Sequence, residues 1–102
     1  MPKTVQFHQW KCYIKASRYR ENNRLALMLV DVEDGAPVAM ATVNLPDVHL
    51  EPGHILIKDY SENAGMLEAL IDAGIVRDTG VRHPAGWVQV PEVELLVQPE
   101  DL

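Results

Sequence analysis

The sequence predicts an α+β domain: a mostly antiparallel sheet of about five to six strands with one helix, at about residues 62–73. Three observations lead to this class. Apolar and polar residues alternate over residues 9–17, residues 25–30 are apolar throughout, and residues 66–71 carry apolar side chains at helical spacing. The chain has 102 residues, the usual size of one domain, so we expect a single domain over residues 1–102.

The first half of the chain predicts three antiparallel strands, at residues 9–17, 25–30 and 38–44. In the first, Trp10, Cys12 and Ile14 alternate with polar residues, so this face, Trp10 included, should lie on the core. The second strand is apolar on both faces, as in the centre of a sheet. A buried helical turn is the alternative for this run, but its short length favours a strand.

Two turns and one loop separate these strands. Residues 21–23 are polar and predict a turn. Residues 33–37 predict a hairpin turn, because Gly35 can adopt the positive φ that closes such loops. Residues 45–53 contain two prolines, which cannot donate to a strand ladder, so we expect a loop there.

The helix follows a short strand at residues 54–58. Ser61 suits the N-cap position, where a hydroxyl accepts a backbone N–H, and the helix is expected over residues 62–73. Gly74 occupies the usual glycine position after the last helical turn. The helix face expected to pack on the core consists of Met66, Leu67, Leu70 and Ile71.

The rest of the chain predicts a terminal hairpin. A strand is expected from residue 75 to about residue 79, a turn region over residues 80–86, and a last strand from residue 87 onward. Pro91 must break that strand, bulge it or lie at a sheet edge, because proline lacks the backbone N–H of a ladder. The tail at residues 98–102 is expected to fray.

The charge is divided unevenly along the chain. The net charge is −6, yet residues 1–24 contain six basic groups and one acid, whereas residues 25–102 contain three basic groups and fourteen acids. The basic segment has two interpretations: a solvated strand edge protected by Lys and Arg, which we favour, or a nucleic-acid strip. The strip would consist of Lys11, Lys15, Arg18, Arg20 and Arg24, with Tyr13 and Tyr19 between them. Because the whole sequence is acidic, direct nucleic-acid binding ranks below protein binding.

Composition also bears on the compartment and on cysteine chemistry. No apolar run reaches the roughly 20 residues of a membrane span and no signal peptide pattern is present, so we expect a cytoplasmic protein. Cys12 is the single cysteine, which excludes an internal disulfide and a cysteine-based zinc site. Its apolar neighbours at alternate positions indicate a buried structural thiol.

One histidine pair raises the question of a metal site. His49 and His54 lie five residues apart in the sequence, with Asp47 and Glu51 nearby. Their spacing fits no helical pair and a Pro-Gly step intervenes, so the ligands would lack a rigid scaffold. We interpret them as polar loop residues, and we expect no metal and no cofactor.

Asp59, Tyr60 and Glu62 lie together at the expected junction of strand and helix. Two carboxylates and a phenol suit acid–base catalysis if a pocket raises one pKa. The simpler interpretation is structural: Asp59 and Ser61 cap the helix, and Tyr60 packs over its first turn. The sequence also lacks a nucleophile elbow, a phosphate loop and a dinucleotide-binding glycine pattern, so we expect no catalytic residues.

Trp87 follows Pro84-Ala85-Gly86 at the start of the last expected strand. A core position is slightly favoured for it. A half-exposed indole is the alternative, and exposed tryptophans are enriched at the energetic centres of protein interfaces.

Three segments resemble a known family: residues 42–46, 57–67 and 74–76, of which a KDYSENxGML motif at residues 58–67 is the most specific. Over about residues 25–96 the chain is similar to a family of small uncharacterised bacterial proteins carried by phages, plasmids and integrated elements. Residues 1–24 have no counterpart in it. The resemblance implies a mobile-element origin and supplies no catalytic residues. Small acidic proteins of such elements often inhibit host defence systems, and anti-CRISPR proteins are the best-known class.

We therefore expect a non-enzymatic inhibitor that binds a host defence protein, a CRISPR effector complex, with its acidic body in a groove made for nucleic acid. The residues expected to contact the partner are Asp31, Glu33, Asp34, Asp59, Tyr60, Glu62 and Trp87. The alternative is a nucleic-acid-binding accessory protein of phage or plasmid maintenance that uses the basic N-terminal segment.

Overall fold

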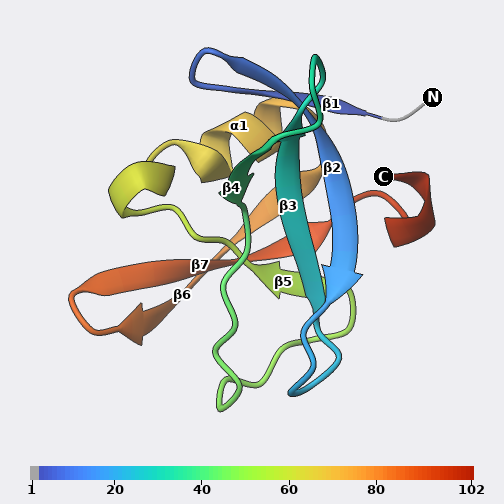
Figure 1. Ribbon diagram of the computed structural model, residues 1–102. Coiled ribbons are helices and arrows are strands. Elements are labelled where there is room, and N and C mark those ends of the chain that lie inside the picture. The colour runs from blue at the N-terminus through green and yellow to red at the C-terminus, as the bar shows by residue number, and fades with distance from the viewer. Residues whose placement is uncertain (1–2) are drawn as a thin grey trace.

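Seven strands in two antiparallel sheets, with one α-helix, make up residues 3–102, which are the residues that the computed structural model describes (Figure 1). The α+β class is confirmed, but the expected single sheet is divided in two, and residues 4–7 add a strand. The strands are β1 (Thr4–Phe7), β2 (Trp10–Arg18), β3 (Leu25–Asp31), β4 (Pro37–Met40), β5 (His54–Leu56), β6 (Val76–Ala85) and β7 (Val88–Leu95). The helical segments are η1 (Ser61–Asn63), α1 (Met66–Asp72) and η2 (Pro99–Asp101).

Strands β1 to β4 form a four-stranded meander in chain order. The alternation expected in β2 is confirmed, because Cys12 and Ile14 are buried whereas Tyr13 between them is 41% exposed. β3 lies between β2 and β4, and Leu27 and Leu29 are fully buried on it. The strand interpretation of this apolar run is therefore correct, and the helical alternative is wrong.

The expected core position of Trp10 is wrong. Trp10 is the first residue of β2, paired with Phe7 across a tight turn in which His8 has a φ of 54°. Phe7 is buried, but Trp10 is 36% exposed, and its ring stands edge-on to the ring of His8. At the end of a strand no second element covers the indole, so alternation alone does not bury it.

The second sheet has the order β5-β7-β6, with β7 in its centre. β6 continues to Ala85 rather than ending near Thr79, because its register with β7 resumes after a bulge between Asp78 and Arg82. Pro91 lies in the central strand, opposite Arg82. Its carbonyl accepts the Ile57 N–H, but it has no N–H to return, and the β5–β7 pairing ends beside it. Pro91 thus ends the β5–β7 ladder, next to the bulge that β6 forms on the other side of β7.

The two sheets meet at one short junction and share one core. Thr42 and Ile57 form an antiparallel bridge, and the Lys58 N–H binds the Ala41 carbonyl beside it. A single hydrophobic cluster draws on both sheets and on α1, and its fully buried members include Val5, Leu27, Leu29, Ile57, Met66, Leu70, Ile75 and Val93. The tail expected to fray, residues 98–102, instead contains the 3₁₀ turn η2 and packs Leu102 against this cluster, next to Val97.

The α-helix is shorter than expected, and Ser61 does not cap it. Residues 61–63 form the separate 3₁₀ turn η1, and α1 begins only after Gly65, whose φ is 96°. Ser61 is exposed, has a φ of 55° and makes no capping hydrogen bond. The carboxylate of Asp59 instead accepts the N–H groups of Gly65 and Leu67, at 3.2 and 2.9 Å. A carboxylate from the end of the preceding segment therefore satisfies the helix N-terminus.

The end of the helix agrees with the sequence. Gly74 has a φ of 74°, its N–H binds the Ile71 carbonyl, and the Ile75 N–H binds the Leu70 carbonyl. This paired arrangement terminates helices with a glycine in the left-handed region. Met66 and Leu70 are fully buried as expected, but Ile71 is 40% exposed, because the short helix packs a narrow stripe on the core. No helix in residues 3–102 has the length and hydropathy to cross a membrane.

Candidate functional site

The acidic residues of the β3–β4 turn are mostly engaged with their own backbone. The Asp31 carboxylate accepts the Glu33 N–H and the Asp34 carboxylate accepts the Ala36 N–H, each at 2.9 Å. These contacts stabilise the turn. The Glu33 side chain is exposed and its carboxylate has no hydrogen-bond partner within residues 3–102, so Glu33 is the one residue of this group whose carboxylate is fully available to a partner.

The second expected group, at the start of the helix, is also held by structural contacts. Asp59 caps α1, as the structural interpretation predicted. Glu62 binds the Lys58 ammonium at 2.6 Å, and this hydrogen bond lowers the pKa of the Glu62 carboxyl. The same ammonium lies 5.7 Å from the centre of the Tyr60 ring, which is half-buried. The structure thus brings Asp59, Tyr60 and Glu62 together, but as a local scaffold.

Trp87 is fully exposed at the tip of the β6–β7 hairpin, so the favoured core position is wrong. It lies in the turn between Ala85 and Val88, which pair with each other, and the preceding Gly86 has a φ of 61°. Figure 1 shows the far end of this hairpin standing clear of the rest of the chain. The indole is therefore the largest apolar side chain that the structure presents without cover.

The basic residues of the N-terminal segment do not form one strip. Lys11, Tyr13 and Lys15 are exposed at alternate positions on one face of β2. The Tyr19 hydroxyl, in contrast, is hydrogen-bonded to the hydroxyl of Thr42 at 2.9 Å. Arg24 donates to the carbonyls of the loop at Leu45 and Val48, so it holds that loop. Three residues of the expected strip therefore share one exposed face. Tyr19 and Arg24 make structural contacts, and Arg18 and Arg20 lie further along the chain.

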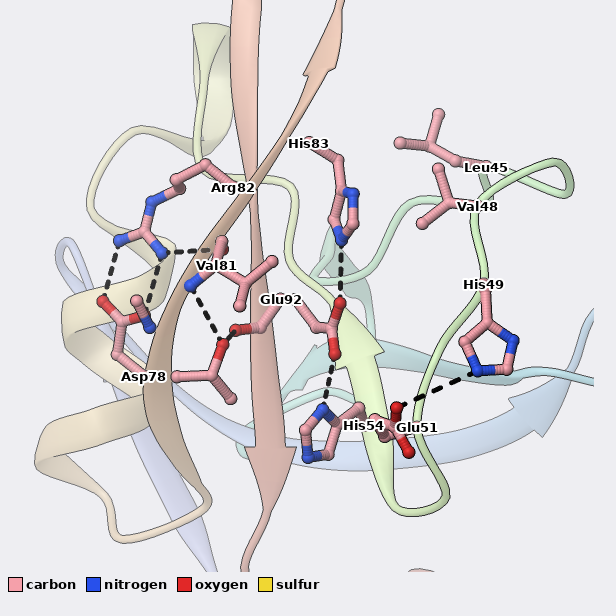
Figure 2. A network of polar contacts seen from close by, with 12 residues as sticks. Leu45, Val48, His49, Glu51, His54, Asp78, Val81, Arg82, His83 and Glu92 are labelled. Atoms are coloured by element: carbon pink, nitrogen blue, oxygen red, sulfur yellow. Dashed lines mark hydrogen bonds and ion pairs between the residues drawn. The ribbon is translucent and has the colours of Figure 1, made fainter.

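A polar cluster in the second sheet escaped the sequence analysis. Glu92, in the central strand β7, is only 6% exposed. One carboxylate oxygen lies 2.6 Å from Nδ1 of His54 on β5, and the other lies 2.7 Å from Nε2 of His83 on β6 (Figure 2). Three neighbouring strands therefore each supply one member of a His-Glu-His cluster. In the sequence, His54 was set beside His49 instead and His83 had no partner, because β6 was expected to end before His83.

The environment of Glu92 fixes its protonation. Burial alone raises its pKa, but the hydrogen bonds from His83 and His54 and the attraction of these imidazoles outweigh burial, and the pKa of Glu92 lies below its ordinary value. The carboxylate is therefore ionised at neutral pH and can only accept hydrogen bonds. It follows that Nδ1 of His54 and Nε2 of His83 both carry a hydrogen.

His49 and His54, the histidine pair considered as a metal site, each contact a different carboxylate. His54 is bound to Glu92, whereas His49 lies on the loop with its Nε2 4.0 Å from Glu51 (Figure 2). In the part of the chain that the structure describes, no group of three or more His, Cys, Asp and Glu residues has the arrangement of a metal site.

A cleft of about 490 Å³ opens beside His54, between the end of β2, the loop at residues 45–53 and the C-terminal segment. Its lining is mixed. Apolar side chains include Leu25, Ile55, Leu56, Leu95 and Val97, and polar ones include Arg18, Tyr19, Arg24, His49, Glu51 and His54. The volume lies within the usual range of small-molecule sites.

Comparisons with models of protein families, with curated proteins and with solved structures find no match to this chain. The resemblance to mobile-element proteins therefore stays a prediction from the sequence. What the chain does must be argued from its exposed groups, its cleft and its charge.

Proposed function

We propose that this chain is a non-enzymatic binding protein that inhibits a host defence protein, a CRISPR effector complex, and that the tip of its β6–β7 hairpin is the main contact. The observation that carries the proposal is the complete exposure of Trp87. An exposed indole can bury a large apolar area on binding, and tryptophan is among the residues that dominate the binding energy of protein interfaces.

The hairpin below Trp87 is well held, which supports its use as an anchor. Both carboxylate oxygens of Asp78 bind the guanidinium of Arg82, at 2.9 and 2.8 Å, and this pair closes the bulge. The Thr79 hydroxyl accepts the Val81 N–H at 3.1 Å and also binds the Glu92 carbonyl. A preorganised hairpin loses less conformational entropy on binding than a mobile loop.

The charge of the molecule supports a basic target. The net charge is −6, and the Glu33 carboxylate stands exposed without an internal partner in the described residues. Carboxylates can occupy a Lys/Arg-lined groove that otherwise holds phosphates. Together with the family resemblance, this directs the proposal to nucleic-acid-handling defence complexes. Asp31, Asp34 and Asp59 contribute to the acidic field, but their contacts give them structural roles first.

The test is capture of partners from a bacterial host lysate on immobilised protein, followed by mass spectrometry and a binding assay with the effector complex recovered. Trp87→Ala should lose the partner. Trp10→Ala is the matched control, because it removes the other tryptophan, which lies away from the hairpin. Equal capture by both variants would show that the hairpin tip is not the contact.

The contribution of charge is tested separately with Glu33→Lys, which leaves the turn contacts of Asp31 and Asp34 intact. Association with a basic groove should become slower in this variant and should weaken steeply with salt in the parent. Competition by the target's own DNA or RNA is expected. Salt-independent binding without such competition would rule out nucleic-acid mimicry but leave a Trp87-centred contact standing.

The second candidate function is the nucleic-acid accessory protein, favoured by Lys11, Tyr13 and Lys15 on one exposed face of β2. An aromatic ring between two lysines suits stacking on a single-stranded base with phosphates on either side. Fluorescence anisotropy with a labelled single-stranded DNA measures this directly. Binding that Lys11→Glu with Lys15→Glu abolishes, and that Trp87→Ala leaves unchanged, would make this the leading function.

A further inference from the structure

We infer that the cleft between β2, the 45–53 loop and the C-terminal segment is a binding site for a small organic anion, with an apolar body and one carboxylate or phosphate group. This site is independent of the Trp87 hairpin and goes beyond the proposed function. The inference rests on two guanidinium groups that line the cleft without an acidic partner in the described residues, and on the apolar floor between them.

The first guanidinium belongs to Arg24, which is half-buried. It donates to the carbonyls of Leu45 and Val48, both neutral acceptors, and it has no acidic partner within residues 3–102. Removing a cation from water without a counter-ion is costly. A ligand carboxylate or phosphate would supply the missing negative charge.

The second guanidinium belongs to Arg18, at the last residue of β2. Arg18 pairs in register with Leu25, the residue after Arg24, so the two arginines stand at the same end of the β2–β3 hairpin and both line the cleft. The guanidinium of Arg18 is exposed and has no hydrogen-bond or ion-pair partner in the described part of the chain. The two arginines of the second sheet differ, because Arg77 binds Glu94 and Arg82 binds Asp78.

The charges around the cleft favour an anion. Two guanidinium groups, those of Arg18 and Arg24, line it against a single carboxylate, Glu51, which lies 4.0 Å from His49. An excess of cationic groups in a cleft concentrates ligands of the opposite sign.

The floor of the cleft defines the rest of the ligand. Leu25, Ile55 and Leu56 are nearly buried, with 8%, 6% and 2% exposure, and they present a small apolar surface beside the arginines. An inorganic ion would leave this surface wet. An aromatic or short aliphatic body attached to the anionic group would cover it and gain the corresponding hydrophobic free energy.

The test is a titration of isotope-labelled protein with phenyl phosphate and, separately, with benzoate, followed by amide chemical shifts at millimolar ligand. At least one probe should shift the resonances of Arg18, Leu56 and Val97 saturably, and the stronger of the two identifies the anionic group. Benzyl alcohol and inorganic phosphate, which each lack one half of the ligand, should bind more weakly. No saturable shift in the cleft, or equal shifts with benzyl alcohol, would overturn the inference.

Arg18→Gln should weaken the better probe about tenfold, as expected for the loss of a charge-assisted contact. Arg20→Gln is the matched control, because it removes the same guanidinium at an exposed position nearby that does not line the cleft. It should change the affinity less than about twofold. Equal effects of the two variants would indicate a response to net charge alone and would contradict a site at Arg18.

Discussion

The four-stranded and the three-stranded sheets cover the same core, but the central strand of each buries a different kind of side chain. β3, in the first sheet, buries Leu27 and Leu29 completely. β7, in the second, buries Val93 and also the carboxylate of Glu92, between two histidines. The first sheet therefore depends on apolar packing. The second also depends on a polar cluster that is sensitive to the loss of any one member, because a buried polar group without its partner is costly.

The largest effect should come from the apolar side of this comparison. Leu27→Ala on β3 and Leu70→Ala on α1 each leave a cavity in the core, since both side chains are fully buried. Each substitution should lower the free energy of unfolding by roughly 2–5 kcal/mol, measured by denaturant titration. Variants that unfold at the same denaturant concentration as the parent would contradict a shared core.

The polar side of the comparison is tested by Glu92→Leu. The substitution removes the acceptor of two imidazole N–H groups, and it should lower the free energy of unfolding by about 1–3 kcal/mol. Glu94→Gln on the same strand is the control, because Glu94 pairs with Arg77 near the surface, where an ion pair contributes little. If Glu92→Leu is as stable as the parent, the cluster does not stabilise the second sheet.

The same cluster makes the stability of the folded protein depend on pH. The pKa of Glu92 is lower in the folded than in the unfolded chain. Its contribution to the free energy of unfolding is therefore complete above the ordinary carboxyl pKa of about 4.3, and it is lost as pH falls through the folded pKa. The melting temperatures of parent and Glu92→Leu should therefore converge in that acidic window. Asp78 follows the same sign at lower pH, because the Arg82 hydrogen bond and the Gly80 N–H hold its pKa at about 2. A constant difference between parent and variant down to pH 2 would contradict this assignment.

A smaller effect distinguishes the two residues that the sequence offered as helix caps. Asp59→Ala removes the acceptor for the Gly65 and Leu67 N–H groups and should cost about 1 kcal/mol. Ser61→Gly should be neutral or slightly stabilising, because Ser61 has a φ of 55°, a region that glycine adopts without strain. Denaturant unfolding of the two variants checks both. A cost for Ser61→Gly that exceeds that for Asp59→Ala would reverse the assignment.

The smallest effect on stability should be that of Trp87→Ala, because a fully exposed indole buries nothing in the free protein. Its melting temperature is expected to match that of the parent, while partner capture is lost. A clear loss of thermal stability would show that the indole packs on the hairpin and would remove the main support for an interface there.

Much of the fold could be predicted from local patterns. The alternation in β2, the apolar run of β3 and the glycine after α1 each act within a few residues, so each is readable along the chain. Asp59 was correctly named as a helix cap, but the helix start was missed because the 3₁₀ turn η1 and Gly65 lie between Asp59 and the first residue of α1. The length of β6 was missed because a bulge interrupts its pattern.

The candidate sites depend on contacts that no local pattern encodes. Glu92 meets His54 only through the pairing of β5 with β7, and the sequence placed His54 in an unrelated pair with His49. The exposure of Trp87 depends on the hairpin turn, and alternation does not report whether a strand end is covered. The acidic residues were correctly located in turns, but their hydrogen bonds to the backbone became visible only in three dimensions.

The strand order of the second sheet also has a kinetic consequence. β1 to β4 pair with their neighbours in sequence, and so do β6 and β7, whereas β5 must reach β7 across α1 and β6. Pairings that close a long loop lose more chain entropy before any contact compensates, so we expect the docking of β5 to follow formation of the meander and of the hairpin. In stopped-flow refolding and unfolding experiments, Leu29→Ala should then lower the folding rate, while Ile55→Ala should mainly raise the unfolding rate. The reverse pattern would contradict this order. Glu92 would accordingly keep one oxygen in water until β5 arrives with the second imidazole.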